Sequence, residues 1–152
     1  TGPSLKLVVE RTPPHAVVGV HIFGEDACEL IHFGTTLVQQ RQSIADILAV
    51  CYAAVTYHEL YKLAARDAVA TLQADRWRAL YYELDVAGDG DGRLSRDEVS
   101  QRLSELDAPE READSILRAL FTDSGDTVGV EQFLRRAQRL QSPLRLDLMR
   151  AT

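Results

Sequence analysis

The sequence predicts an α+β N-terminal part, in which a β-hairpin packs on helices, followed by an all-α C-terminal part. Two runs rich in Val, Ile and Leu, residues 5–9 and 17–23, flank a turn that contains two prolines, and this is the pattern of a hairpin. After about Gln73 the strand-like runs stop, and helical patterns alternate with acidic loops. We therefore expect two domains and a tail, with these bounds: 1–73, 74–141 and 142–152.

Composition narrows the class of protein. Of the 152 residues, 45% are hydrophobic and 26% are charged, which is typical of a folded globular chain. No apolar run approaches the length of about 18 residues that a membrane span needs, so we expect none. The net charge of -6 disfavours nucleic acid as a partner, because phosphate attraction needs a basic face. Cys28 and Cys51 lie far apart in helical patterns, so we expect buried free thiols in an intracellular protein.

Capping patterns mark the starts of the N-terminal helices. The helix that follows the first pattern is expected to run to about Gln40, and the next one to about Val50. After the third pattern no Pro or Gly occurs until Gly88, so that helix either continues to Leu84 or breaks near residues 73–75. The three capping pairs are Asp26 with Glu29, Ser43 with Asp46, and Thr56 with Glu59.

The most specific motif is the acidic stretch of residues 85–98. Calcium prefers six to eight hard oxygen ligands in a compact loop, with a glycine at the turn and a bidentate Glu at the end. Arg93 offers a backbone carbonyl, and Leu94 is placed to form a short β-bridge with a partner loop. The residues that fit positions 3, 5, 6, 8, 9 and 12 of a calcium loop are Asp89, Asp91, Gly92, Leu94, Ser95 and Glu98. This spacing resembles the EF-hand family.

The start of this loop has two possible registers. A strict twelve-residue loop would begin at Ala87, which has no carboxylate, whereas a loop with two extra residues would begin at Asp85. A loop that begins at Ala87 places Glu83 at a position where the family has an apolar residue. A loop that begins at Asp85 places Leu84 and Tyr81 at the apolar positions, so the Asp85 start is favoured. We expect weaker affinity than in a regular loop, and a turn that binds nothing is the alternative. The expected calcium ligands are Asp85, Asp89, Asp91, Arg93, Ser95 and Glu98.

A second, degenerate loop follows at residues 121–132. Val128 fits the β-bridge position, but Asp123 is the one good ligand left in the front half. We expect this loop to complete the pair without binding calcium, so the C-terminal part is predicted to be an all-α EF-hand pair. Three residues depart from the calcium pattern: Phe121 for the first carboxylate, Asp126 for the glycine and Gln132 for the final Glu.

The N-terminal part carries a second resemblance. Residues 17–24 read VVGVHIFG, residues 27–34 read ACELIHFG, and residues 56–65 continue the pattern. These segments resemble the C-terminal interface domain of flavin-dependent pyridine nucleotide-disulfide oxidoreductases, with soluble NAD(P) transhydrogenases as the closest branch. The resemblance covers roughly residues 5–72 and implies a dimerisation domain that begins inside the family's sheet, which leaves an edge for a partner chain or a missing segment.

The catalytic parts of that family are not visible in the sequence. Its disulfide-reducing members use a His-Pro-Thr-x-x-Glu segment, and here Ala54 stands at the His position, with Thr56 and Glu59 following. We therefore interpret Glu59 as a helix-capping residue. Because no GxGxxG fingerprint follows a strand, FAD and NAD(P) are expected only in a full-length parent, whose transhydrogenase activity the sequence leaves open.

The leading hypothesis is a non-catalytic dimerisation module with a calcium-binding EF-hand. Its source would be the C-terminal end of a flavin-dependent NAD(P) transhydrogenase-like protein or a subunit of a larger assembly, in the cytosol or the mitochondrion. Expected partners are a second copy of the chain, missing upstream domains, or other subunits. The alternative is a purely structural scaffold subunit of a multi-protein complex without functional calcium binding, which the apolar residues of the 142–152 tail favour.

Overall fold

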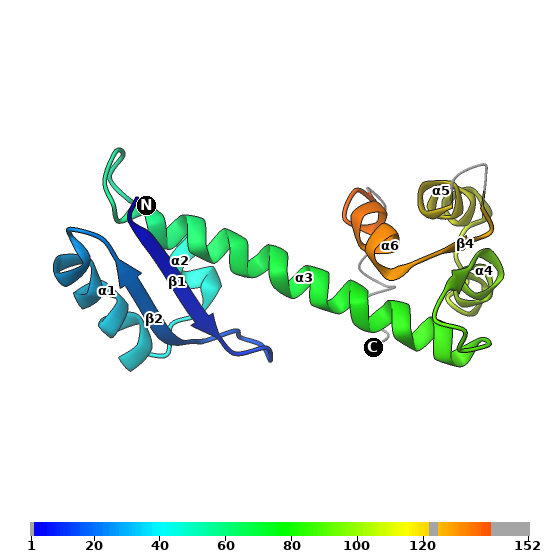
Figure 1. The fold of residues 1–152 in the computed structure, drawn as a ribbon, viewed down its shortest axis with the longest axis horizontal. Helices are drawn as coiled ribbons and strands as arrows, with labels where there is room; N and C mark the ends of the chain where they lie inside the picture. Colours follow the sequence, from blue (N-terminus) through cyan, green and yellow to red (C-terminus); the bar gives the residue numbers. More distant parts are fainter. Residues whose placement is uncertain (1, 122–124, 141–152) are drawn as a thin grey trace. The chain divides into compact units, whose positions relative to one another are not determined.

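The computed structural model describes residues 2–121 and 125–140. Within these residues the fold is mixed α+β, with six helices and two small antiparallel sheets (Figure 1). The chain divides into two compact units, unit 1 over Thr1–Leu72 and unit 2 over Gln73–Thr152. Among the described helices, none combines the length and the apolar character that crossing a bilayer requires. The tail predicted over 142–152 lies outside the described residues.

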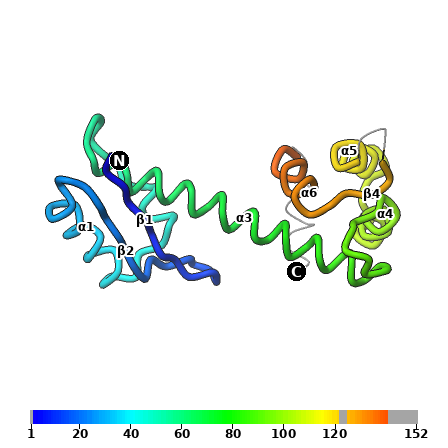
Figure 2. The backbone as a smooth tube through the Cα atoms, in the orientation of Figure 1, coloured from blue at the N-terminus to red at the C-terminus, as the bar shows by residue number. Residues whose placement is uncertain are grey.

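Unit 1 begins with the predicted hairpin. Strand β1 (Ser4–Val9) pairs antiparallel with β2 (Val17–Phe23), which confirms both strands. Figure 2 follows the backbone from this hairpin into the helices of the unit. Helix α1 (Ala27–Gln39) packs against β2, and it covers the face on which the alternate, half-buried residues Leu5 and Leu7 of β1 lie.

The two predicted capping boxes at α1 and α2 differ in outcome. Ser43 caps α2 (Ile44–Ala49) as expected, because its hydroxyl accepts from the Asp46 N–H at 3.2 Å and the Asp46 carboxylate accepts from the Ser43 N–H at 2.8 Å. At α1 the prediction is wrong, since the Asp26 side chain accepts no capping hydrogen bond. Its backbone has φ -92° and ψ 16°, which is not the extended conformation that an N-cap residue needs.

The cysteines are free, but the predicted burial is wrong, because both are exposed. Helix α1 buries Leu30, Gly34 and Leu37, and Cys28 precedes this series by two residues, which places it on the opposite side of the helix. Cys51 follows the end of α2 in a connecting segment. The apolar patterns therefore located the two helices, but they did not predict the exposure of these two side chains.

Helix α3 (Glu59–Ala87) is continuous over 29 residues, so the predicted alternative of a break near residue 73 is wrong. It starts later than the Thr56 pattern suggested. The Glu59 carboxylate reaches back to the N–H of Val55 at 3.1 Å, and the Thr56 hydroxyl donates to a backbone carbonyl. Glu59 therefore acts at the helix start, but with a partner other than Thr56.

Unit 2 contains the C-terminal turns of α3 and five shorter elements. These are β3 (Leu94–Ser95), α4 (Arg96–Glu105), α5 (Glu110–Leu120), β4 (Thr127–Val128) and α6 (Val130–Ala137). The pair Leu94↔Val128 joins β3 to β4, which confirms the predicted bridge between the two loops. The core of this unit consists of fully buried side chains from every helix, the largest being Trp77, Tyr81, Phe121 and Phe133.

Candidate metal centre

Three carboxylates converge at the end of α3. Asp85 stands in the last turn of the helix and is 4% exposed, whereas Asp89 and Asp91 lie in the exposed loop that follows. One carboxylate oxygen from each residue lies within 4.8 Å of the other two. Of the acidic groups that the sequence assigned as ligands, these three are brought together, at a separation that one cation can bridge.

The loop backbone is shaped around these carboxylates. Gly90 and Gly92 have φ values of +66° and +81°, a conformation that glycine adopts without steric cost. The Gly92 N–H donates to the Asp85 Oδ1 at 3.0 Å, and the Arg93 N–H donates to the Asp91 Oδ1 at 2.7 Å. The loop is therefore closed onto a carboxylate that the helix supplies, while the exposed Ala87 at the competing start of the loop has no donor oxygen in its side chain.

Glu98 has a different role in this structure. Its Oε2 accepts from the Ser95 N–H at 2.7 Å and from the Ser95 hydroxyl at 2.8 Å, and its Oε1 accepts from the Asp89 N–H at 3.2 Å. The first contact belongs to the capping box at the start of α4, whose other hydrogen bond runs from the Glu98 N–H to the Ser95 hydroxyl at 3.2 Å. Glu98 is not part of the group formed by the three aspartates. The remaining expected ligand is the backbone carbonyl of Arg93. The side chain of this residue donates from Nε to the Thr127 hydroxyl at 3.0 Å.

Gly88 makes room for this arrangement. A Cβ at this position would lie 1.8 Å from the Glu98 Oε1 and 2.5 Å from its carboxyl carbon, well inside van der Waals contact. Any other residue would displace the Glu98 carboxylate from the Asp89 N–H. The sequence alone assigned no role to Gly88. The signal that could have found it is the Ser-x-x-Glu spacing of residues 95 and 98, which predicts a capping box and therefore the position of the Glu98 carboxylate.

The Glu98 carboxyl makes the stability of unit 2 depend on pH. Burial alone would raise its pKa, but the hydrogen bonds from Ser95 and Asp89 outweigh burial and hold the pKa below its ordinary value of 4.5. Because the pKa of Glu98 is lower in the folded state than in the unfolded state, its ionised carboxylate stabilises the fold at pH values above the unfolded-state pKa. This stabilisation is lost as the pH falls through the folded-state pKa. We expect Glu98→Gln to be less stable than wild type at pH 7, and the difference to shrink below about pH 4.5. Urea denaturation at pH 7 and pH 3 measures this, and a difference that grows on acidification would contradict it.

Tyr81 joins the helix to both loops. Its hydroxyl lies 2.9 Å from the Gly92 carbonyl and 3.1 Å from the Val128 carbonyl, so it is within hydrogen-bond distance of each loop at the β3–β4 ladder. Burial raises the pKa of this phenol, and the group therefore stays protonated and able to donate near neutral pH. The sequence placed Tyr81 at an apolar position before the loop and gave no sign of its polar contacts.

Removing this hydroxyl tests the connection. Tyr81→Phe keeps the ring and deprives two carbonyls of their shared donor, so we expect it to lower the free energy of unfolding by about 1–3 kcal/mol. Thermal or urea denaturation measures the change. Tyr57→Phe, at a position 50% exposed in unit 1, is the matched control and should leave stability unchanged within about 0.5 kcal/mol. Equal effects of the two substitutions would show that the Tyr81 contacts contribute nothing.

The second loop is closed by packing and by Arg96. Phe121, at its first position, is 1% exposed, and the Arg96 guanidinium lies 5.4 Å from its ring centroid. The Asp126 carbonyl accepts from the Arg96 N–H at 2.8 Å. Asp123, the ligand expected to survive there, lies outside the described residues. The buried ring at the first position supplies no side-chain oxygen to a cation.

The donor set of the first loop fits a hard divalent cation. Its three convergent groups are all carboxylates, without His or Cys, and oxygen ligands suit calcium or magnesium better than zinc. Comparison with models of known protein families, with curated proteins and with solved structures finds no match to this chain.

Proposed function

We propose that this chain is a non-catalytic module that binds calcium in the 85–98 loop, in the manner of an EF-hand. The observation that carries the proposal is the convergence of Asp85, Asp89 and Asp91 within 4.8 Å. Two of these carboxylates are exposed to solvent, and the third is buried at the end of α3. A cation can reach such a site from solvent and still meet a charge that water does not screen.

The paired architecture supports an EF-hand in place of an isolated acidic turn. The loop is flanked by two helices, α3 and α4, and its Leu94 pairs with Val128 of a second helix–loop–helix unit. Leu94 and Val128 are both buried, so the second loop supports the first one through this pairing. The sequence of the second loop lacks a complete ligand set of its own. We propose one calcium site for the described chain.

Calcium calorimetry tests this proposal against the scaffold alternative. We expect a saturable heat with a stoichiometry of one ion per chain, at calcium concentrations below roughly 1 mM. Magnesium is the comparison ion, because it demands a tighter octahedral site and dehydrates reluctantly. Absence of any heat up to that concentration would favour a scaffold in which the loop is only structural.

Unit 1 supports a second proposal, self-association. The face of the hairpin away from α1 carries Val8 and Phe23, which are 38% and 65% exposed. A two-stranded sheet is marginal by itself, and its outer backbone groups can pair with another chain. With the resemblance of residues 5–72 to an oxidoreductase interface domain, these features favour a homodimer.

Sedimentation equilibrium tests association. We propose that calcium also affects it, since α3 contributes residues to both units. The experiment compares the dimer dissociation constant in calcium and in chelator, for wild type and for Phe23→Ser. A monomer at every concentration would refute the dimer, and identical constants in the two buffers would refute only the calcium effect.

A further inference from the structure

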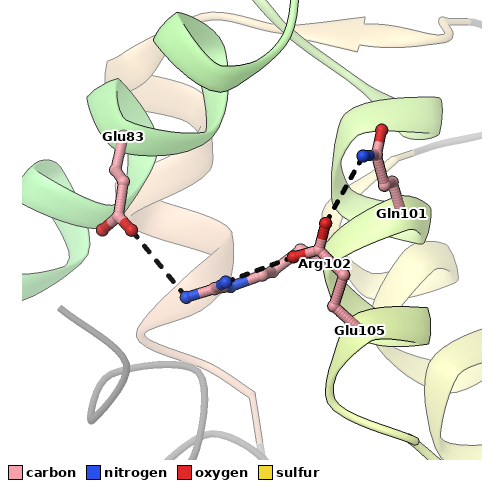
Figure 3. A network of polar contacts seen from close by, with 4 residues as sticks. All are labelled: Glu83, Gln101, Arg102 and Glu105. Carbon is pink, nitrogen blue, oxygen red and sulfur yellow. Dashed lines mark hydrogen bonds and ion pairs between the residues drawn. The ribbon is translucent and has the colours of Figure 1, made fainter.

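A small hollow lies between the end of α3 and helix α4. Its volume is about 60 Å³, and Glu83, Gly88, Glu98 and Arg102 are among the residues that line it. The hollow is therefore lined both by the capping carboxylate of Glu98 and by charged side chains that do not belong to the group of three aspartates. Figure 3 shows that these charges come from both helices.

Arg102 links the two helices that flank the calcium loop. Its guanidinium lies 3.8 Å from the Glu83 carboxylate on α3 and 3.3 Å from the Glu105 carboxylate on α4. Gln101 donates in turn to Glu105 at 3.4 Å, as Figure 3 shows. The Arg102 side chain is 19% exposed, so it is partly withdrawn from solvent, whereas Glu83 is 45% exposed. The contact between Glu83 and Arg102 is the interhelical one in this network.

The position of Arg102 relates this contact to the metal site. Glu98 and Arg102 are four residues apart on α4 and therefore share one face of the helix. That face is directed toward the end of α3, since both residues line the hollow with Glu83 and Gly88. Since both residues lie on α4, a rigid movement of this helix that carried Glu98 would also change the separation of Arg102 and Glu83.

We propose that the Glu83–Arg102 ion pair is a restraint that weakens calcium binding, an inference that rests on the proposed calcium site. The pair holds α4 against α3 in the arrangement in which Glu98 binds Ser95 and the Asp89 N–H. To add its carboxylate to an ion held by the three aspartates, Glu98 must leave these donors. An interaction made only in the ion-free state lowers the affinity for the ion by the factor by which it favours that state.

Calcium titration of Glu83→Gln distinguishes this restraint from a simple charge effect. Removal of a negative charge near a cation site weakens binding if only electrostatics acts. Loss of the restraint instead strengthens binding, and for a partly exposed pair we expect about a two- to fivefold lower dissociation constant. In the Arg102→Gln background the restraint is already absent, so Glu83→Gln should no longer strengthen binding. Asp114→Asn, which breaks the exposed Asp114–Arg118 pair on α5, is the control and should leave affinity unchanged or slightly lower.

The outcomes distinguish failure of the restraint from failure of the calcium site. Calcium binding by wild type with equal or weaker binding by Glu83→Gln would overturn the restraint and leave the calcium site standing. Strengthening by Glu83→Gln that persists in the Arg102→Gln background would overturn the pairing of these two residues. No calcium binding by wild type would overturn both the site and the restraint. Circular dichroism melts of all variants verify that each is folded during the titration.

Discussion

Replacing Asp85 by Asn is expected to weaken calcium binding by about tenfold or more, because even residues that only support a metal ligand cost 10–100-fold when they are changed. Asp85 is the buried member of the three carboxylates, at 4% exposure, and its charge is the least screened by water. Asn has nearly the same shape and keeps an oxygen that can accept from the Gly92 N–H. The substitution therefore removes the charge and preserves the loop closure, and calorimetric titration measures its effect.

Asp97→Asn is the matched control. Asp97 is an exposed aspartate in the first turn of α4, close to the loop in sequence and outside the group of three carboxylates. Asp97→Asn removes one negative charge, as Asp85→Asn does. We expect its affinity to stay within about threefold of wild type, as befits a solvent-screened charge. If Asp85→Asn and Asp97→Asn weakened binding equally, the site would be a diffuse acidic surface in place of a defined ligand set.

Trp77→Ala is expected to destabilise unit 2 by about 3–5 kcal/mol, the usual cost of truncating a large buried aromatic residue. Trp77 is fully buried in the core, and its ring meets Phe133 edge to face, with centroids 6.0 Å apart. The substitution leaves a cavity between α3 and α6 that the rigid neighbours can fill only in part. Urea denaturation followed by circular dichroism measures the loss without relying on tryptophan fluorescence.

Tyr82→Ala provides the comparison on the same helix. Tyr82 is 49% exposed, so its truncation should cost less than about 1 kcal/mol. The two variants change neighbouring turns of α3 and differ mainly in burial. A Trp77→Ala protein as stable as Tyr82→Ala would show that the packing of α3 against α6 does not hold unit 2 together.

Much of the fold follows from local patterns in the sequence. The two strands of the hairpin and the Ser43 capping box were predictable, because alternation and a Ser-x-x-Asp spacing act over a few residues. The Leu94–Val128 ladder was predictable from the position of each residue in its loop. The cap expected at Asp26 failed because the backbone enters α1 through a turn, and that conformation has no signature in residue type.

The convergence of Asp85, Asp89 and Asp91 was predictable from the sequence, but the contacts around these residues were not. Three of the expected carboxylates converge, since the glycines and the helix end fix the path of a short loop. Glu98 was expected to face the ion, yet in this structure it caps α4 through Ser95. The same two residues fit both roles, so sequence alone does not choose between them. The contacts of Tyr81 and Arg102 depend on elements distant in the sequence, and residue patterns carry no information about them.

NMR observation of the backbone amides during a calcium titration reveals whether calcium binds in the 85–98 loop. The N–H groups of Gly92 and Arg93 donate to the Asp85 and Asp91 carboxylates, so an ion that binds these oxygens must change the amide shifts. We expect saturable shift changes at these two amides with a common dissociation constant, and no comparable change at Ile47, which is fully buried in α2 of unit 1. Unchanged Gly92 and Arg93 signals at saturating calcium would contradict a calcium site in this loop.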